Sequence, residues 1–500
     1  MRAVPAFSVV FILFGSLLGC GSETFPWEIR MPASVRDQAA SVEASIAEGS
    51  CATPGNVVYR VSLRRGEGAD PPQNLAEGSF AFFARVLDDS CNVIAEGCVS
   101  RSLPIEELVV DAASVTASPQ CGAAACDRGV CTTVTPSTCA AEGCIGVVQA
   151  VSAGRNHTCA INAAAELWCW GRNAEGQLGI EESGELWTVP RRVNLTSVDS
   201  VAAGGATDAT SGHTCAISAG ELSCWGDNTF GQLGTMDART PTVVAGLPGP
   251  VIAVAAGGRH SCAIVDGGEL HCFGDNREGQ LDGEPSASTG PVLVPAEVPV
   301  TSVALGDMHS CSHGESTECW GSNESGRVGR NVAGPVTGVS SVNSARETGL
   351  LAVGGGHAIT LATNGIVRCW GNNENGQCTG GENGFARASA VDGIEQNTVV
   401  DVAAGGAHSC AVRTDRTLIC WGQNQAGQLG VGGEVLEART PELVESVLGV
   451  AAVSTGGEHS CAIDTQGTLF CWGQNRSGQL GIGTEAEALT PMRVMGSGPQ

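Results

Sequence analysis

The stretch HSCAIDTQGTLFCWGQNRSGQLG, at residues 459–481, decides the fold of this chain. It holds two short apolar segments, HSCAI and GTLFCWG, which a polar turn separates and a glycine-rich tail follows. Short segments with alternating or β-branched residues between glycine turns predict strands rather than helices. The same pattern occurs as GRNHTCAI with CWGRNAEGQLG at 154–179, and as GAHSCAV with CWGQNQAGQLG at 406–430.

The motif recurs seven times, with 47 to 56 residues between successive histidines. A period near 50 residues predicts one supersecondary unit per repeat, and we expect a four-stranded β-meander in each. A single sheet of this kind cannot bury its faces, whereas seven packed around an axis form a closed β-propeller. We therefore predict an all-β fold with a seven-bladed propeller over residues 147–495. The motif histidines are His157, His213, His260, His309, His357, His408 and His459.

An aromatic residue precedes the first glycine of each tail and supplies apolar area where one blade lies on the next. We expect these aromatic residues to have a structural role. We expect the same of the motif histidine, which should be hydrogen-bonded inside its own blade. The tail glycines allow positive φ, and the asparagine can bond its own turn backbone. The aromatic positions are Trp170, Trp225, Phe273, Trp320, Trp370, Trp421 and Trp472.

These copies resemble the repeat of the regulator of chromosome condensation family, whose fold is a seven-bladed propeller. The resemblance extends from Val147 to Val494 and rests on the in-register tail as well as on the histidine. Four copies depart from the pattern: the second inserts GGATDATSGH, the third reads CFGDNREGQLDG, the fourth GSNESGRVG, and the fifth replaces HSC by HAI. The departures concern single blades and leave the predicted architecture unchanged.

Cysteines in six repeats stand eight to ten residues apart, where adjacent strands of a hairpin bring them within disulfide range. The fifth repeat has Ile359 in place of its first cysteine, and its remaining pair are each other's default partners. A zinc site is the competing interpretation, but each blade offers only three ligands, so we predict no metal and no cofactor. The predicted pairs are Cys159/Cys169, Cys215/Cys224, Cys262/Cys272, Cys311/Cys319, Cys369/Cys378, Cys410/Cys420 and Cys461/Cys471.

The first residues predict the compartment. Arg2 precedes an apolar stretch too short to span a bilayer, which is typical of a signal peptide over residues 1–19. The sequence Leu17-Leu18-Gly19-Cys20 resembles the lipobox of bacterial lipoproteins, which implies lipid attachment at Cys20 and a tether over 20–33. An ordinary secretory signal is the alternative. The residue after Cys20 is Gly rather than Asp, which favours the outer over the inner membrane of the cell envelope.

Residues 34–115 alternate apolar and polar side chains and predict a small β-sandwich-like domain, tied by Cys51, Cys91 and Cys98. A cysteine-rich spacer over 116–146 follows; it is too short for a core of its own. Without Cys20 the chain holds 22 cysteines, an even number that suits an oxidising compartment. The pairing of the eight cysteines between Cys51 and Cys144 stays open.

The charge balance excludes several partner classes. The chain has 52 Asp and Glu against 26 basic residues, all of them Arg, and a net charge of -26. This charge repels phosphate, so we expect neither nucleic-acid binding nor adsorption to anionic lipid. The membrane is then contacted only through the lipid on Cys20, and we expect a monomer.

No nucleophile elbow, phosphate-binding loop or paired zinc motif is present in the sequence, so we predict that the protein is not an enzyme. Only His271 and His313 lie outside the seven motif positions. We favour a protein-binding or scaffold module that uses loops on one propeller face. The alternatives are inhibition of a periplasmic or secreted enzyme and binding of a cell-surface glycan. Nucleotide exchange on a small GTPase, which the resemblance also implies, conflicts with a secretory signal.

The segments that depart most from the repeat are the expected partner contacts. They are polar and rich in Gly and Ser, and three arginines within or beside them are candidate anchors on an acidic surface. The segments are Ala206–Ser211, Glu284–Pro295, Asn331–Thr348 and Gly380–Gln396, and the arginines are Arg330, Arg346 and Arg387.

Overall fold

The computed structural model describes residues 145–498 apart from 183, 207–211, 284–289, 297, 330–335, 343–347 and 379–384. Before residue 145 it describes the backbone of nine strands, β1 to β9. The chain divides into two compact units, 1–138 and 139–500. The predicted signal peptide, Cys20 and the tether up to residue 26 lie outside the described residues. In the described part of the chain, no helix has the length and apolar character needed to cross a membrane.

The first unit is built from strands alone in its described residues. Five strands form an antiparallel sheet in the order β3-β2-β4-β5-β7, and β1 pairs with β6 in a parallel ribbon that contacts the sheet through β6. The hairpin β8-β9 places Cys126 opposite Cys131. The strands are β1 (Trp27–Arg30), β2 (Ser41–Gly49), β3 (Pro54–Arg64), β4 (Ser79–Leu87), β5 (Asn92–Ser102), β6 (Leu108–Asp111), β7 (Ala113–Pro119), β8 (Cys126–Asp127) and β9 (Val130–Cys131).

The second unit is a seven-bladed propeller, so the predicted all-β propeller is confirmed. Each blade is a four-stranded antiparallel meander whose strands pair in chain order. Blade one is β10 (Val148–Ala153), β11 (His157–Asn162), β12 (Leu167–Arg172) and β13 (Leu186–Arg192); blade two is β14 (Val198–Ala203), β15 (His213–Ser218), β16 (Glu221–Gly226) and β17 (Ala238–Val243); blade three is β18 (Val251–Ala256), β19 (His260–Val265), β20 (Leu270–Gly274) and β21 (Val292–Leu293). Blade four is β22 (Ser302–Leu305), β23 (His309–His313), β24 (Thr317–Gly321) and β25 (Val336–Ser341), with a 3-10 turn at Glu324–Gly326; blade five is β26 (Thr348–Val353), β27 (His357–Ala362), β28 (Val367–Asn372) and β29 (Phe385–Ala390). Blade six is β30 (Val399–Ala404), β31 (His408–Arg413), β32 (Leu418–Gln423) and β33 (Glu437–Leu443); blade seven is β34 (Val450–Thr455), β35 (His459–Asp464), β36 (Leu469–Gly473) and β37 (Ala488–Arg493).

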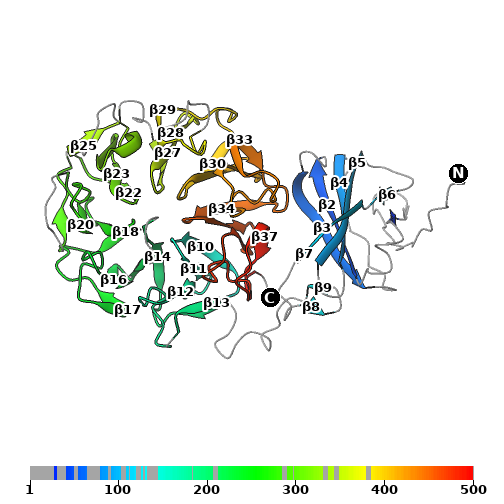
Figure 1. The fold of residues 1–500 in the computed structure, drawn as a ribbon, viewed down its shortest axis with the longest axis horizontal. Coiled ribbons are helices and arrows are strands. Elements are labelled where there is room, and N and C mark those ends of the chain that lie inside the picture. The colour runs from blue at the N-terminus through cyan, green and yellow to red at the C-terminus, as the bar shows by residue number, and fades with distance from the viewer. Residues whose placement is uncertain are drawn as a thin grey trace, which may run out of the picture. The chain divides into compact units, whose positions relative to one another are not determined.

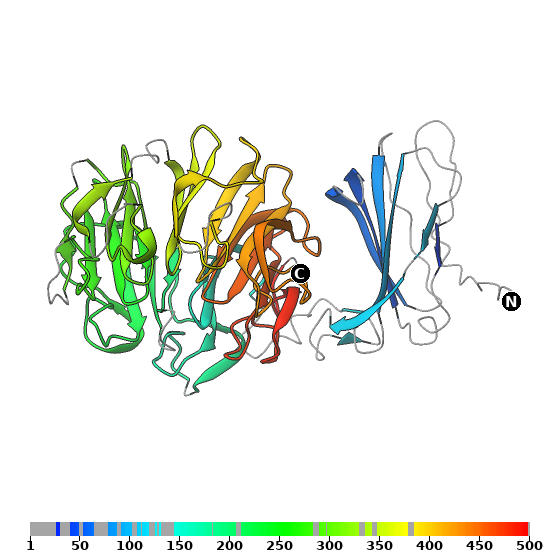
Figure 2. The ribbon, with the colours of Figure 1, turned by 45° about the horizontal axis from the view of Figure 1, so that its top comes forward.

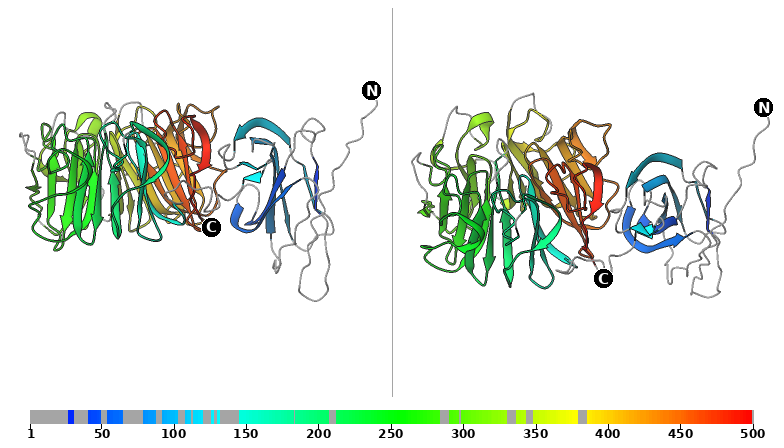
Figure 3. Two further views of the ribbon diagram at one scale, coloured as in Figure 1. Left: turned by 90° about the horizontal axis from the view of Figure 1, so that it is seen from below. Right: turned by 60° about the horizontal axis from the view of Figure 1, so that its bottom comes forward.

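The first strand of every blade lies innermost, where it contacts the first strands of both neighbouring blades (Figure 1). The ring closes between blades one and seven, because Gly146 forms a parallel bridge with Ser497 and β10 contacts β34 and β35. In the turned views the strands run from one face of the propeller to the other (Figure 2, Figure 3). The Gly-x-x-His turns and the loops between third and fourth strands share one end of the blades, which we call the loop face.

The register explains why the motif repeats so strictly. In each blade the second strand pairs with the third so that the histidine faces the glycine of the Cys-Trp-Gly or Cys-Phe-Gly sequence, as His459 faces Gly473. The residue after the histidine then faces the aromatic residue, and the next faces a cysteine. All seven aromatic side chains are fully buried, and they are the largest fully buried side chains among the described residues.

Candidate functional site

Six of the seven motif histidines form a hydrogen bond with the neighbouring blade. Nε2 of His157 in blade one lies 2.8 Å from Oγ1 of Thr214 in blade two, and that hydroxyl donates to the Gln177 carbonyl of blade one at 2.8 Å. Because the hydroxyl proton goes to the carbonyl, the imidazole must donate from Nε2, which assigns the neutral Nε2–H tautomer. The prediction of a bond inside one blade is wrong, since the bond crosses the junction. Five further junctions repeat it, through His213–Ser261, His260–Ser310, His357–Ser409, His408–Ser460 and His459–Thr158.

Burial keeps these imidazoles uncharged. Desolvation lowers the pKa of His213 and His357 to about 4, and it lowers the pKa of four others to about 3. Neighbouring histidines lower the pKa of His157 further. Every motif histidine also has a buried Nδ1 without a hydrogen-bond partner in the described part of the chain. Protonation would therefore place a charge in an apolar junction, so these residues act as uncharged connectors between blades.

The junction between blades four and five lacks this connection. Blade five has Ala358 where the other blades have Ser or Thr, so this position offers no hydroxyl to His309. Both ring nitrogens of His309 are buried and unpaired among the described residues. The HAI departure of the fifth repeat therefore removes one inter-blade hydrogen bond and leaves a buried donor unsatisfied.

The tryptophans bind the same carbonyls as the hydroxyls. Trp225 Nε1 donates to the Gln177 carbonyl at 3.1 Å, and Trp472 Nε1 donates to the Gln428 carbonyl at 2.9 Å. A Cβ at Gly179 would lie 2.6 Å from Trp225 Nε1, so the tail glycine lets the loop of one blade close over the indole of the next. The structure thereby assigns the glycine-rich tail to blade–blade packing.

Seven disulfides lie inside the propeller. Six join the second and third strands of one blade with Cα atoms 4.1 Å apart, and the seventh joins Cys369 to Cys378 with Cα atoms 5.3 Å apart. All fourteen cysteines of these disulfides are buried. The other pairs are Cys159–Cys169, Cys215–Cys224, Cys262–Cys272, Cys311–Cys319, Cys410–Cys420 and Cys461–Cys471.

A small hollow opens on the axis at the loop face, lined by the glycines that end the innermost strands. Their backbones bond from blade to blade, as from Gly205 N to Gly257 O at 2.9 Å and from Gly406 N to Gly456 O at 3.0 Å. A Cβ at Gly354 would lie 2.1 Å from the Gly405 carbonyl oxygen, so the ring requires glycine there. Arg155 and Asp307 supply charged side chains to this hollow.

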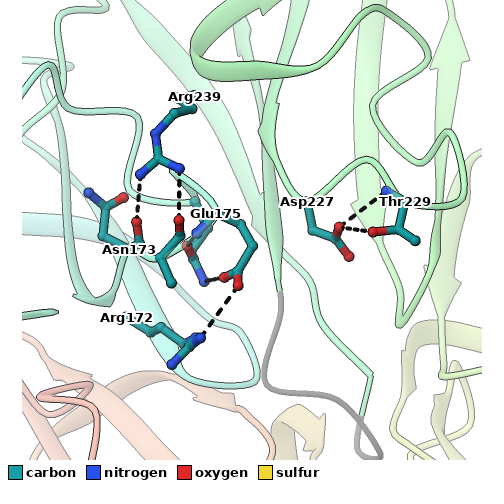
Figure 4. A network of polar contacts seen from close by, with 8 residues as sticks. Arg172, Asn173, Glu175, Asp227, Thr229 and Arg239 are labelled. Atoms are coloured by element: carbon teal, nitrogen blue, oxygen red, sulfur yellow. Dashed lines mark hydrogen bonds and ion pairs between the residues drawn. The ribbon is translucent and has the colours of Figure 1, made fainter. Parts of the chain in front are cut away.

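Two arginines on outer strands fasten neighbouring loops on the loop face. Arg239 of β17 donates from Nη1 to the Ala174 carbonyl at 2.7 Å and from Nη2 to the Asn173 carbonyl at 3.0 Å (Figure 4). Arg439 of β33 donates to the Glu374 carbonyl at 2.8 Å. We call this contact the arginine clamp. Arg387 occupies the same register position on β29, since Ala386 faces Gly371 as Ala438 faces Gly422.

Much of the predicted contact surface lies outside the residues that the structure describes. Arg330 and Arg346, parts of all four variable segments and the side chain of Arg387 are outside the described residues. The two histidines outside the motif have local partners: His271 Nε2 lies 3.4 Å from Glu269 Oε2, and His313 Nδ1 lies 3.3 Å from Thr317 Oγ1. Among the described residues, no cluster of three or more His, Cys, Asp or Glu could hold a metal ion.

Two family profiles, both described as regulator of chromosome condensation (RCC1) repeat, match the propeller. One matches residues 148–177, 251–280, 350–377, 399–428 and 450–479, and the other matches 165–217, 219–264, 267–312, 417–463 and 466–499. The chain belongs to the RCC1 repeat family. The ultraviolet-B receptor UVR8 of Arabidopsis thaliana is 28% identical over 372 residues, covering 69% of this chain and 81% of the receptor. The probable E3 ubiquitin-protein ligase HERC3 of Homo sapiens is 36% identical over 115 residues, which are 23% of this chain and 11% of the ligase.

Solved structures share the RCC1 fold. The yeast RCC1 protein Prp20, solved bound to Kap60, matches with a TM-score of 0.60 and 21% identity, over 66% of this chain and 83% of that one. Prp20p from Saccharomyces cerevisiae, described with its binding to Gsp1p and histones, matches with a TM-score of 0.60 and 20% identity, over 70% and 87%. At these identities the likeness concerns the fold alone. Prp20 itself is seen in complex with a protein, Kap60.

Proposed function

We propose that this protein is a lipid-anchored RCC1 propeller of the bacterial cell envelope that binds a partner protein through its loop face, without catalysis. The observation that carries the protein-binding part is the loop face itself. Blade-to-blade bonds hold the backbone that supports it, while its loops expose apolar and charged side chains, among them Leu436 and Glu434. A rigid scaffold that presents variable loops is the arrangement on which binding sites commonly form.

The motif histidines support a role without catalysis. They are buried, and six of the seven commit Nε2 to a hydroxyl of the next blade. A general base must reach a substrate proton at hydrogen-bond distance, which these buried rings do not. The chemistry that the sequence concentrates in each repeat therefore serves assembly of the ring.

The disulfides support an extracytoplasmic location. Disulfides persist in oxidising compartments such as the bacterial periplasm and cell surface, and they are rare in the cytosol. Seven in one propeller fit the lipobox-like sequence that ends at Cys20. Attachment through Cys20 would place the propeller at the outer membrane rather than the inner one, because the residue after Cys20 is Gly and not Asp.

The test is a pull-down with the oxidised full-length mature protein against outer-membrane and secreted fractions. Retention of one protein in stoichiometric amount supports the binding function, and an assay of that protein's activity distinguishes a scaffold from an inhibitor. Retention of a glycan instead of a protein would replace the proposal by cell-surface glycan recognition. Mass spectrometry of the N-terminal peptide tests the lipid on Cys20 independently.

A further inference from the structure

Three exposed apolar side chains meet where blade six adjoins blade seven on the loop face. Leu436 is 63% exposed, Leu489 is 44% exposed and Val435 is 37% exposed. Val435 and Leu436 end the loop between β32 and β33, and Leu489 lies on β37. A Cβ at Gly433 of this loop would lie 2.8 Å from Leu489 Cδ1, so Leu489 rests against the loop. We call Val435, Leu436 and Leu489 the rim patch.

Leu489 stands where an arginine clamp stands in two other blades. Gly473 faces Ala488, as Gly226 faces Ala238 and Gly422 faces Ala438, so the following residues Leu489, Arg239 and Arg439 share one register position. By the same alignment, the Gln425 carbonyl corresponds to the Ala174 and Glu374 carbonyls, which the two arginines bind. Within the described part of the chain, no side chain donates to the Gln425 carbonyl. The junction therefore has the backbone acceptor of the clamp but, among the described residues, no guanidinium that binds it.

Carboxylates surround the rim patch. Glu437 pairs with Arg439 at 2.7 Å and Glu487 pairs with Arg476 at 3.2 Å, whereas exposed Glu434 makes no ion pair with a described residue. The whole chain carries a net charge of -26 and no lysine, so its field repels a second copy of itself and attracts a cationic partner. The acidic charge of the chain, the exposed apolar side chains of the rim patch and the Gln425 carbonyl acceptor thus all favour a partner segment that carries arginine and apolar residues.

We propose that the rim patch is the docking site for a basic segment of a partner protein, in which apolar side chains cover Leu436 and Leu489 and an arginine replaces the missing clamp. The inference rests on the proposed protein-binding function and adds the surface and the partner chemistry. The arginine donates to the Gln425 carbonyl, as Arg239 donates to the Ala174 carbonyl at 2.7 Å within the chain.

The test uses a synthetic peptide of alternating arginine and leucine, and measures its binding to the full-length mature protein by fluorescence anisotropy. L489R supplies the guanidinium from the chain itself, and L436S removes the most exposed leucine of the patch. M236S is the matched control, because Met236 is an 82% exposed apolar residue on a loop-face loop of blade two. A glutamate–leucine peptide and an arginine–serine peptide separate the charge requirement from the apolar requirement.

We expect the arginine–leucine peptide to bind the unchanged protein, to bind L489R and L436S at least about tenfold more weakly, and to bind M236S equally well. We expect the two control peptides to bind more weakly. Equal affinity for L489R and the unchanged protein would overturn the docking site, as would failure of the arginine–leucine peptide to bind. A thermal midpoint of L489R at or above that of the unchanged protein shows that it folds.

The two proposals fail differently. If the mature protein retains an envelope protein in the pull-down and L489R retains it equally well, the rim patch is excluded and the protein-binding function stands. If the mature protein retains no protein, the binding function itself fails, and the rim patch fails with it.

Discussion

Replacing Ala358 by Ser should stabilise the propeller, because it restores the hydroxyl that only the junction between blades four and five lacks among the seven motif positions. Ala358 is fully buried and follows His357 in the same register as Ser409 follows His408. In Ala358→Ser, the new hydroxyl lies between His309 Nε2 and the Arg327 carbonyl. That carbonyl already accepts the Trp370 Nε1 proton at 3.1 Å, as the corresponding glutamine carbonyls do elsewhere.

The expected gain in the free energy of unfolding follows from His309 Nε2, which is buried without a hydrogen-bond partner among the described residues. A buried donor without a partner costs about 1 to 3 kcal/mol, and a net hydrogen bond contributes about 1 kcal/mol. The new hydroxyl satisfies His309 Nε2 and donates its own proton, so its desolvation is compensated. We expect the free energy of unfolding to rise by about 1 to 2 kcal/mol. Ser409→Ala makes the opposite change at the next junction, and we expect a loss of about 1 to 3 kcal/mol.

Urea unfolding of the oxidised protein, followed by fluorescence of the buried tryptophans, measures both changes. Ala411→Ser is the control, because Ala411 is equally buried but does not face an imidazole, so an added hydroxyl there should destabilise. A stability of Ala358→Ser no higher than that of Ala411→Ser would refute the hydrogen-bond reasoning. So would a Ser409→Ala protein as stable as the unchanged one.

Acid should destabilise the propeller, because six of the motif histidines bind protons less readily when folded, at a pKa of about 3 to 4, than at about 6.5 when unfolded. Stability is thus full above pH 6.5 and falls as the pH drops, by about 2 kcal/mol per histidine at pH 5, which a series of urea curves measures. Replacing Cys461 and Cys471 together by Ala should lower the free energy of unfolding by about 2 to 3 kcal/mol, and equal urea midpoints would contradict this. Arg239→Ala should speed amide hydrogen exchange in residues 173–185 while leaving the loops of blade four unchanged. Cys20→Ser should move the protein from the membrane fraction to the soluble fraction, and a protein that stays in the membrane would exclude the lipid anchor.

The repeat made the architecture predictable. Copies of one pattern, spaced 47 to 56 residues apart, require one sheet each, and the spacing of the cysteines follows from strand pairing within a hairpin. The aromatic residue before glycine was predicted to lie between blades, and Trp472 does so through the Gln428 carbonyl. These inferences succeed because they depend on contacts within one repeat or on a role that every repeat shares.

Contacts between blades were not predictable in the same way. The histidine was expected to bond within its own blade, yet His157 bonds Thr214, 57 residues away. The serine or threonine after each histidine was a signal in the sequence, since a small hydroxyl residue recurs there in six of seven copies. The role of this residue can be inferred only from the closed ring, in which its hydroxyl lies against the imidazole of the neighbouring blade. Arg387, expected to anchor a partner, shares its register position with two arginines that fasten loops of their own chain.

The sequence by itself determined the number of blades, the strands within each and the pairs of cysteines, because local pairing and burial of one sheet face require them. Only the tertiary structure decided what lies across each junction. Ala358 and Leu489 look like ordinary substitutions in a repeat, and they become an unsatisfied imidazole and an exposed apolar patch because the partner of each comes from the next blade. In a closed ring, residues at a junction contact residues one repeat away, and those contacts determine whether a polar group is hydrogen-bonded and whether an apolar side chain is covered.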